Sequence, residues 1–101
     1  MRTFVYASSG GVYGNSTLTC NEDDPIGPSG ELGFYLGTKL CGEIIAENYT
    51  SYMNVIIVRP FFVYGPGQRK DMLIPRLVER VRNEQAIQLI GDDGLLINPI
   101  Y

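Results

Sequence analysis

The spacing of apolar residues changes twice in the first 60 positions, and each change predicts a different element. Residues 3–8, TFVYAS, are typical of a strand buried on both faces of a parallel sheet. From Phe34 to about Met53, apolar residues recur every three or four positions, which predicts a helix with one apolar stripe. Residues 54–60, NVIIVRP, form a second strand-like run that proline stops. This order predicts a βαβ unit with two parallel strands. The stripe comprises Leu36, Leu40, Cys41, Ile44, Ile45 and Tyr49, and we expect Glu43, Glu47 and Asn48 on other faces of the helix.

Turn-forming residues separate these elements from one another and from a weaker pattern at the end of the chain. Gly, Pro, Asn and Asp between residues 14 and 33 predict a long surface loop, and FFVYGPGQ after the second strand predicts another. Residues 71–83 predict a helix that begins near Met72 or Leu73, because Pro75 fits only its first turn. We expect a short strand at AIQLIG, a turn at DDG and a last strand in LLINPIY.

Composition narrows the class of protein. The chain has 101 residues, enough for one small domain, and its net charge of -3 with scattered arginines argues against a nucleic-acid partner. It has no apolar run of about 20 residues that could span a membrane, and we expect a cytoplasmic protein. The absence of histidine excludes a Ser-His-Asp triad and a Cys-His dyad within the chain. Cys20 and Cys41 do not form a CxxC pair, so we expect no metal site.

Candidate ligand-binding residues lie where the predicted strands end. In an open parallel sheet, ligands bind beyond the carboxyl ends of the strands, where Ser8, Ser9 and the FFVYG segment fall. Tyr35 and Lys39 are four residues apart, so they share one helix face. A lysine cation stabilises a neighbouring phenolate, and a serine hydroxyl can hold a substrate oxygen. This set suits the proton transfer that accompanies hydride transfer. Each piece alone also fits a surface tyrosine, a solvated lysine or a turn, and their order favours a site.

Four segments, YASSGGVYG, YLGTK, RPFFVYGPGQ and NPIY, occur in the order seen in one known family. The chain resembles the extended short-chain dehydrogenase/reductases, specifically the NAD-dependent epimerase/dehydratase group that acts on nucleotide sugars. The resemblance implies an α/β fold with a partial Rossmann-like parallel sheet: the βαβ unit, a helix and short C-terminal strands. It implies NAD as cofactor, with NADP left open. Residues 1–101 are then expected to be an internal fragment of one NAD(P)-binding domain, with residues from about 66 to 101 leading into the substrate-binding part. The Gly-rich turn that binds the pyrophosphate has no counterpart in the sequence.

The same resemblance assigns roles to individual residues. It implies that Ser9 is the catalytic serine, that Tyr35 is the acid/base, and that Lys39 binds the cofactor ribose and assists Tyr35. In the family, NAD takes a hydride from a sugar carbon and usually returns it. The expected cofactor-binding residues are Ser8, Tyr35, Lys39, Pro60, Phe61, Phe62 and Val63, and the expected substrate-binding residues are Ser9, Gly10, Gly11 and Phe62.

Departures from the family pattern narrow the expected activity. Gly10 and Gly11 stand where family dehydratases tend to have Asp and Glu, which favours an epimerase or a reductase. Phe62 and Ile97 replace an asparagine and an arginine that contact the substrate diphosphate in many members. Three arginines of the second helix could compensate, although a solvated face explains them more simply; they are Arg76, Arg80 and Arg82.

The leading interpretation is a sugar or nucleotide-sugar epimerase. One alternative is an NADP-dependent reductase of a small carbonyl compound, and another is a non-catalytic α/β remnant that pairs with a partner chain or with itself. The resemblance also implies a homo-oligomer, since the family often dimerises through the helix bearing Tyr35 and Lys39 and the helix packed beside it. Exposure of Ile45, Tyr49 or Met53 would be consistent with that.

Overall fold

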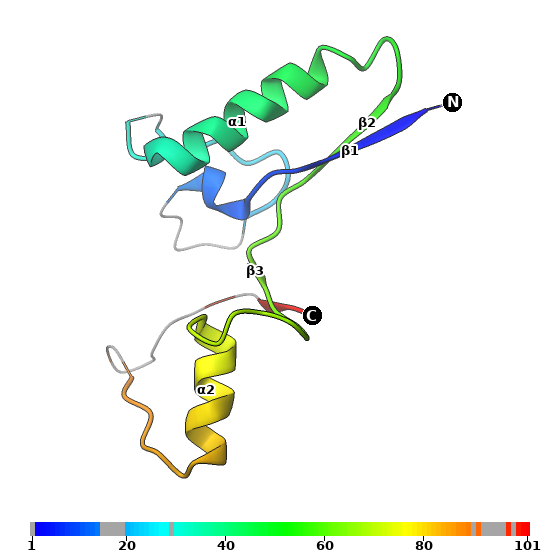
Figure 1. The fold of residues 1–101 in the computed structure, drawn as a ribbon. Helices are drawn as coiled ribbons and strands as arrows, with labels where there is room; N and C mark the ends of the chain where they lie inside the picture. Colours follow the sequence, from blue (N-terminus) through cyan, green and yellow to red (C-terminus); the bar gives the residue numbers. More distant parts are fainter. Residues whose placement is uncertain (1, 15–19, 29, 90, 92–96, 98) are drawn as a thin grey trace. The chain divides into compact units, whose positions relative to one another are not determined.

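The computed structural model contains two compact units, residues 1–61 and residues 62–101, and each is described by itself (Figure 1). The first unit contains β1, the short 3-10 helix η1, α1 and β2, and the second contains β3, α2 and β4. The structure describes residues 2–14, 20–28, 30–89, 91, 97 and 99–101.

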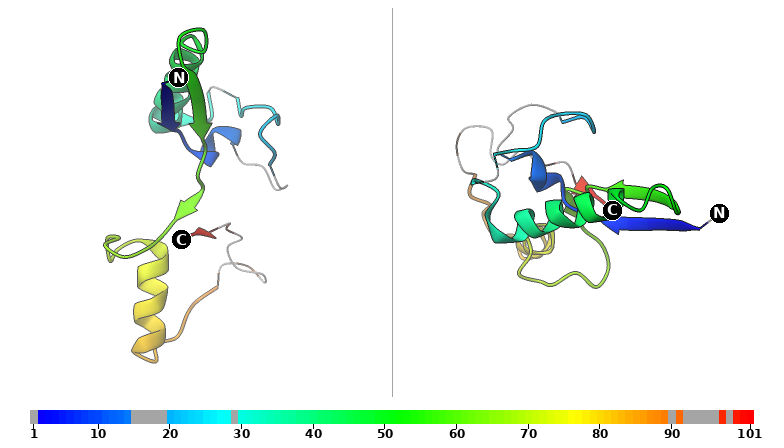
Figure 2. Two further views of the ribbon diagram at one scale, coloured as in Figure 1. Left: turned by 90° about the vertical axis from the view of Figure 1, so that its right-hand side faces the viewer. Right: turned by 90° about the horizontal axis from the view of Figure 1, so that it is seen from above.

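The first unit is a βαβ unit, as predicted. β1 (Thr3–Ala7) and β2 (Asn54–Val58) pair in parallel, from Thr3 opposite Asn54 to Ala7 opposite Val58. The connection between them contains α1 (Gly33–Glu47), which lies along the strand pair in Figures 1 and 2. The βαβ arrangement therefore brings the carboxyl ends of both strands to the same edge of the sheet.

The interior of this unit is small and partly polar. Among the described residues, the apolar side chains that are buried are Val12, Leu32 and Ala46. Ser8 and Glu43 are buried beside them. The strand faces stay more open than predicted: β1 is largely exposed, because in the described part of the chain one strand and one helix contact it.

An apolar groove of about 350 Å³ lies between β1 and α1. Its wall includes Gly42, where an added Cβ would lie 2.0 Å from the Tyr6 hydroxyl oxygen, so that only glycine lets the Tyr6 ring lie this close to the helix. The other lining residues are Phe4, Tyr6, Ile45, Ala46, Tyr49 and Met53.

The predicted boundaries and faces of the first helix need correction. α1 ends at Glu47, about six residues earlier than expected, because the chain tightens into turns. The amides of Asn48, Tyr49 and Thr50 each bond to a carbonyl three residues back. The side chains of Asn48 and Thr50 also bond to the carbonyls of Ile44 and Glu47. Much of the expected apolar stripe is exposed, whereas Glu43, predicted on another face, is the helix residue that is buried most deeply.

The second unit holds a smaller parallel pair. β3 (Phe62–Val63) pairs with β4 (Pro99–Ile100), so the segment expected to be a loop after Pro60 contains a strand. α2 (Leu73–Arg82) begins where predicted, with Pro75 in its first turn. The strand predicted at AIQLIG is wrong for residues 86–89, which have no strand partner in the described chain. The DDG turn and residues 95, 96 and 98 of the last predicted strand lie outside the described residues.

No helix in the described ranges is long and apolar enough to cross a membrane.

Candidate active site at the carboxyl end of β1

The chain leaves β1 one residue earlier than predicted, yet it continues to follow β2. The amide of Ser8 donates to the carbonyl of Val58 at 2.8 Å, and the amide of Gly10 donates to that of Pro60 at 2.9 Å. The chain then turns into η1 (Gly10–Tyr13). Ser9 caps this helix, because its Oγ accepts a hydrogen bond from the Gly11 amide at 3.2 Å. Ser9 is therefore held at the exit of the strand, between β1 and η1.

Lys39 links α1 to the same strand end. Its Nζ donates to the carbonyl oxygen of Ala7 at 2.8 Å and lies 5.8 Å from the centroid of the Tyr35 ring. It also lies 5.7 Å from the centroid of the Tyr6 ring. An ammonium has three donors, and Ala7 takes one of them. The Lys39 cation is thus next to the phenol ring of Tyr35. The carbonyl group that it binds belongs to Ala7, two residues before Ser9 in the sequence.

Two glycines after Ser9 are enclosed by apolar side chains. A Cβ added to Gly10 would lie 2.6 Å from atoms of the Phe61 ring, and one added to Gly11 would lie 2.8 Å from a methyl group of Leu36. The Phe61 ring in turn stacks on Tyr13, with centroids 6.4 Å apart and planes inclined by 14°. A side chain at Gly10 would displace this ring, so the turn depends on glycine.

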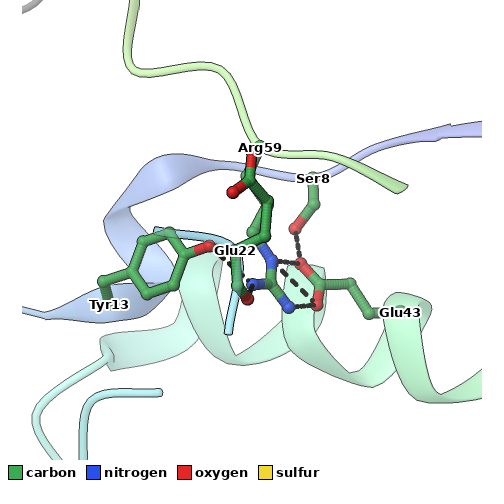
Figure 3. A network of polar contacts seen from close by, with 5 residues as sticks. All are labelled: Ser8, Tyr13, Glu22, Glu43 and Arg59. Atoms are coloured by element: carbon green, nitrogen blue, oxygen red, sulfur yellow. Dashed lines mark hydrogen bonds and ion pairs between the residues drawn. The ribbon is translucent and has the colours of Figure 1, made fainter. Parts of the chain in front are cut away.

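A buried ion pair lies one helical turn beyond Lys39 (Figure 3). Arg59 Nη2 lies 2.6 Å from Glu43 Oε2, and Arg59 Nε donates to Glu43 Oε1 at 3.0 Å, so the pair is bidentate. The Ser8 hydroxyl donates to the same carboxylate. Arg59 Nη1 donates to the Tyr13 hydroxyl at 2.7 Å and to the carbonyl of Glu22 at 3.3 Å. We call this set, Ser8, Tyr13, Glu22, Glu43 and Arg59, the Glu43–Arg59 network.

The network keeps the side chains of Glu43 and Arg59 ionised. Burial favours the neutral form of Glu43, but hydrogen bonds from Arg59 and Ser8, together with the Arg59 charge, outweigh it and lower the pKa of Glu43. The hydrogen bond to Glu43 is the main cause that raises the pKa of Arg59, and the bond to Tyr13 adds to it against the effect of burial. Glu43 is therefore an ionised carboxylate inside the fold near neutral pH.

Sequence reasoning missed this network. Glu43 follows Lys39 by four residues, which places both on one face of α1, and that spacing was the signal available in advance. Its partner Arg59 is 16 positions away on another element, a separation that no local pattern encodes.

The first unit places most of the predicted site residues along one strand end. Ser9 and Gly11 share a hydrogen bond, Gly10 packs on Phe61, and Lys39 joins Tyr35 to β1. Ser8 is buried, with its hydroxyl on Glu43. Phe62 and Val63 form β3 of the second unit, where each is about half exposed. The cofactor, substrate and catalytic roles expected for these residues remain predictions.

Comparison with known proteins defines the family. Residues 1–95 match the NAD dependent epimerase/dehydratase family. A protein described as an uncharacterized UDP-glucose epimerase, YtcB of Bacillus subtilis, is 34% identical over 94 residues, which cover 91% of this chain and 29% of that protein. A UDP-glucuronate 4-epimerase of Thermodesulfobacterium geofontis is 30% identical over 98 residues, which cover 91% of this chain and 28% of that protein.

A solved structure of an epimerase also resembles this chain. The UDP-glucuronic acid 4-epimerase of Bacillus cereus, in complex with NAD, aligns with a TM-score of 0.69 and 33% identity over 89% of this chain and 29% of its own. The chain therefore belongs to the NAD-dependent epimerase/dehydratase family, and the Rossmann-like α/β fold class expected from the sequence is confirmed. The chain spans less than a third of the length of these relatives.

Proposed function

We propose that this chain carries the proton-transfer site of an NAD-dependent nucleotide-sugar epimerase, with Tyr35 as acid/base, Lys39 as its cationic partner and Ser9 as the hydroxyl that holds the substrate. The observation that carries the proposal is the position of Lys39. Its Nζ is bonded to Ala7 at the end of β1 and lies 5.8 Å from the Tyr35 ring centroid, which joins the helix residues of the proposed set to the strand that leads into Ser9.

The relatives support the choice of substrate class. The similar proteins from Bacillus subtilis and Thermodesulfobacterium geofontis carry the names of a UDP-glucose and a UDP-glucuronate epimerase, and the Bacillus cereus enzyme has been solved with UDP-glucuronic acid and NAD. We infer from these names a UDP-sugar as substrate and NAD as cofactor.

The donor set of this chain fits part of NAD. An ammonium with donors beyond the one used by Ala7, and a phenol on a tyrosine that is 61% exposed, suit the hydroxyl groups of a ribose. The Phe61 ring, 44% exposed, offers an apolar surface to a flat ring such as nicotinamide. Lys39, Tyr35 and Phe61 are thus the residues that would hold the ribose and nicotinamide end. When bound, NAD supplies the acceptor for a hydride and the means to return it.

The protein residues then have separate tasks. The Ser9 hydroxyl orients the substrate oxygen, since a hydroxyl has one donor and two acceptor positions and the Gly11 amide takes one acceptor position. Tyr35 would take the proton from that oxygen while the sugar carbon is oxidised, and would give it back when that carbon is reduced again. Lys39 stabilises the charge on the phenolate through its nearby cation.

Two substitutions test these roles in the full-length protein encoded by the reading frame that contains this chain. Tyr35→Phe should lower turnover of UDP-glucose or UDP-glucuronic acid about 10²- to 10⁴-fold, the usual contribution of acid–base catalysis, and leave the Kd for NAD nearly unchanged. Lys39→Met should lower turnover and also weaken NAD binding, because it removes a contact to the ribose and the cation that stabilises the phenolate. Tyr52→Phe is the matched control, since Tyr52 is 80% exposed and lies in the connection between α1 and β2. Equal, mild effects at Tyr35 and Lys39 would contradict the proposal.

A further inference from the structure

We propose that the Glu43–Arg59 network positions Ser9: Arg59, anchored by Glu43, holds Tyr13, and Tyr13 fixes the Ser9–Gly11 turn through the Phe61 ring. The inference rests on the proposed function, because it assigns a role to Ser9 in turnover. Tyr13, Glu43 and Arg59 are positioning residues in this account.

The end of β1 is bonded to α1 through two successive residues. Two successive residues of the chain, Ala7 and Ser8, are bonded to two successive turns of α1, through Lys39 and Glu43. Because Ser9 is the next residue, its backbone starts from a point that is tied to the helix carrying Tyr35. Loss of the Glu43 carboxylate removes one of these two ties and leaves the Lys39 tie in place.

Arg59 bonds to Tyr13 on the far side of the turn. The guanidinium of Arg59 is planar and presents several donors at fixed angles. It uses Nε and Nη2 for Glu43 and Nη1 for Tyr13, so the position of the Tyr13 hydroxyl is set relative to the helix (Figure 3). The side chain of Glu43 is 3% exposed and that of Arg59 is 20% exposed, so Glu43 is shielded from water and Arg59 is partly accessible.

The Phe61 ring lies between Tyr13 and the glycine that follows Ser9. The Tyr13 ring stacks on Phe61, and the Phe61 ring fills the space where a side chain on Gly10 would stand. The amide of Gly10 bonds to Pro60, the residue between Arg59 and Phe61. The turn is therefore clamped between the end of β2 and the aromatic pair. A displacement of Tyr13 is transmitted to Gly10 and hence to the hydroxyl of Ser9.

Tyr13→Phe is the sharpest perturbation, because it deletes the hydroxyl bonded to Arg59 and keeps the ring that stacks on Phe61. In the full-length protein we expect kcat to fall roughly tenfold, since misplacement of a reacting group by an ångström can cost up to about a hundredfold, while KM changes by less than about twofold. Arg59→Lys keeps the charge beside Glu43 but loses the planar fork, and should lower kcat by a similar factor. Tyr52→Phe is the control for the loss of a tyrosine hydroxyl.

A double-mutant cycle decides whether Tyr13 acts through Ser9. If it does, Tyr13→Phe has no further effect on kcat in a Ser9→Ala background, because the group that it positions is already gone. Full additivity of the two losses, or an unchanged kcat in Tyr13→Phe alone, overturns the inference while leaving the proposed function intact. An unchanged kcat in Ser9→Ala overturns the role of Ser9 in the proposed function, a different result.

Hydrogen exchange supplies a readout that does not depend on activity. The amides of Gly10, Val12 and Gly14 bond to carbonyls within or beside the turn. In Tyr13→Phe these three should exchange faster than in the wild type, and the amides of β1 should not change. Unaltered exchange at all three would show that Tyr13 does not hold the turn and would overturn the inference, whatever the kinetics.

Discussion

Replacing Arg59 by methionine tests the energetics of the buried ion pair. The change leaves the carboxylate of Glu43, whose side chain is 3% exposed, without its counter-ion. Removing one partner of a buried pair costs about 3–5 kcal/mol. The lower end applies here, about 3 kcal/mol, because the Ser8 hydroxyl still donates to Glu43 and Arg59 is itself partly exposed. Since a chain of this size is stabilised by only about 5–15 kcal/mol, a loss of this size is readily measured.

The dependence of this loss on pH has a definite sign. In the wild type the pKa of Glu43 is lowered, so its stabilising effect is present above the pKa of an unfolded glutamate, about 4.3, and disappears as pH falls through the folded value. In Arg59→Met, burial dominates and raises the pKa of Glu43, so the variant gains stability by taking up a proton as pH falls. Both effects reduce the difference in the free energy of unfolding between wild type and variant as pH falls.

Urea unfolding followed by far-ultraviolet circular dichroism at pH 7 and pH 4 measures both quantities. Arg69→Met is the matched control, because Arg69 pairs with Asp71 at a site where both side chains are mostly exposed, and its loss should matter far less. The double variant Glu43→Gln, Arg59→Met should recover part of the loss at pH 7, since no unpaired charge remains. A deficit no larger than that of Arg69→Met, or one that widens toward pH 4, would refute the reasoning.

Two further predictions concern packing. Gly10→Ala should destabilise the protein, because the new methyl group would lie 2.6 Å from the Phe61 ring, and adding Phe61→Ala should reverse part of the loss in thermal unfolding; equal Tm values for Gly10→Ala and the wild type would contradict the contact. The chain should self-associate through the groove between β1 and α1, where Ile45 and Tyr49 are 62% and 50% exposed, and Ile45→Glu should shift sedimentation toward the monomer; a wild-type chain that sediments as a monomer at all concentrations would rule this out.

The local pattern predicted the elements that repeat regularly, and failed where distant residues decide. The β-branched run at 54–58 and the three- and four-residue spacing after Gly33 identified β2 and α1, because both signals lie within a few residues. The end of α1 was missed because it depends on side chains of Asn48 and Thr50 that bond to the backbone. The strand β3 was missed because two residues show no periodicity and its partner lies 37 positions on.

In the candidate site, too, local patterns identified some residues, and contacts between distant segments decide the rest. Tyr35 and Lys39 were found by helix spacing, and Ser9 by its place after a strand. Glu43 was placed on another face because it lies outside the apolar stripe that the spacing predicts. Its pairing with Arg59 exists only once β2 lies beside α1. The contact between Gly10 and Phe61 is likewise a product of the assembled unit.

The parallel pairing of β1 with β2 has a consequence for biosynthesis. Each residue of β1 finds its partner 51 positions later, as Thr3 does with Asn54. At about 5–20 residues per second, a ribosome needs roughly 3–10 s to make the intervening chain. During this time the Phe4 and Val5 side chains do not yet have β2 beside them. We therefore expect the β1–β2 pairing to form only after α1 and β2 have been synthesised.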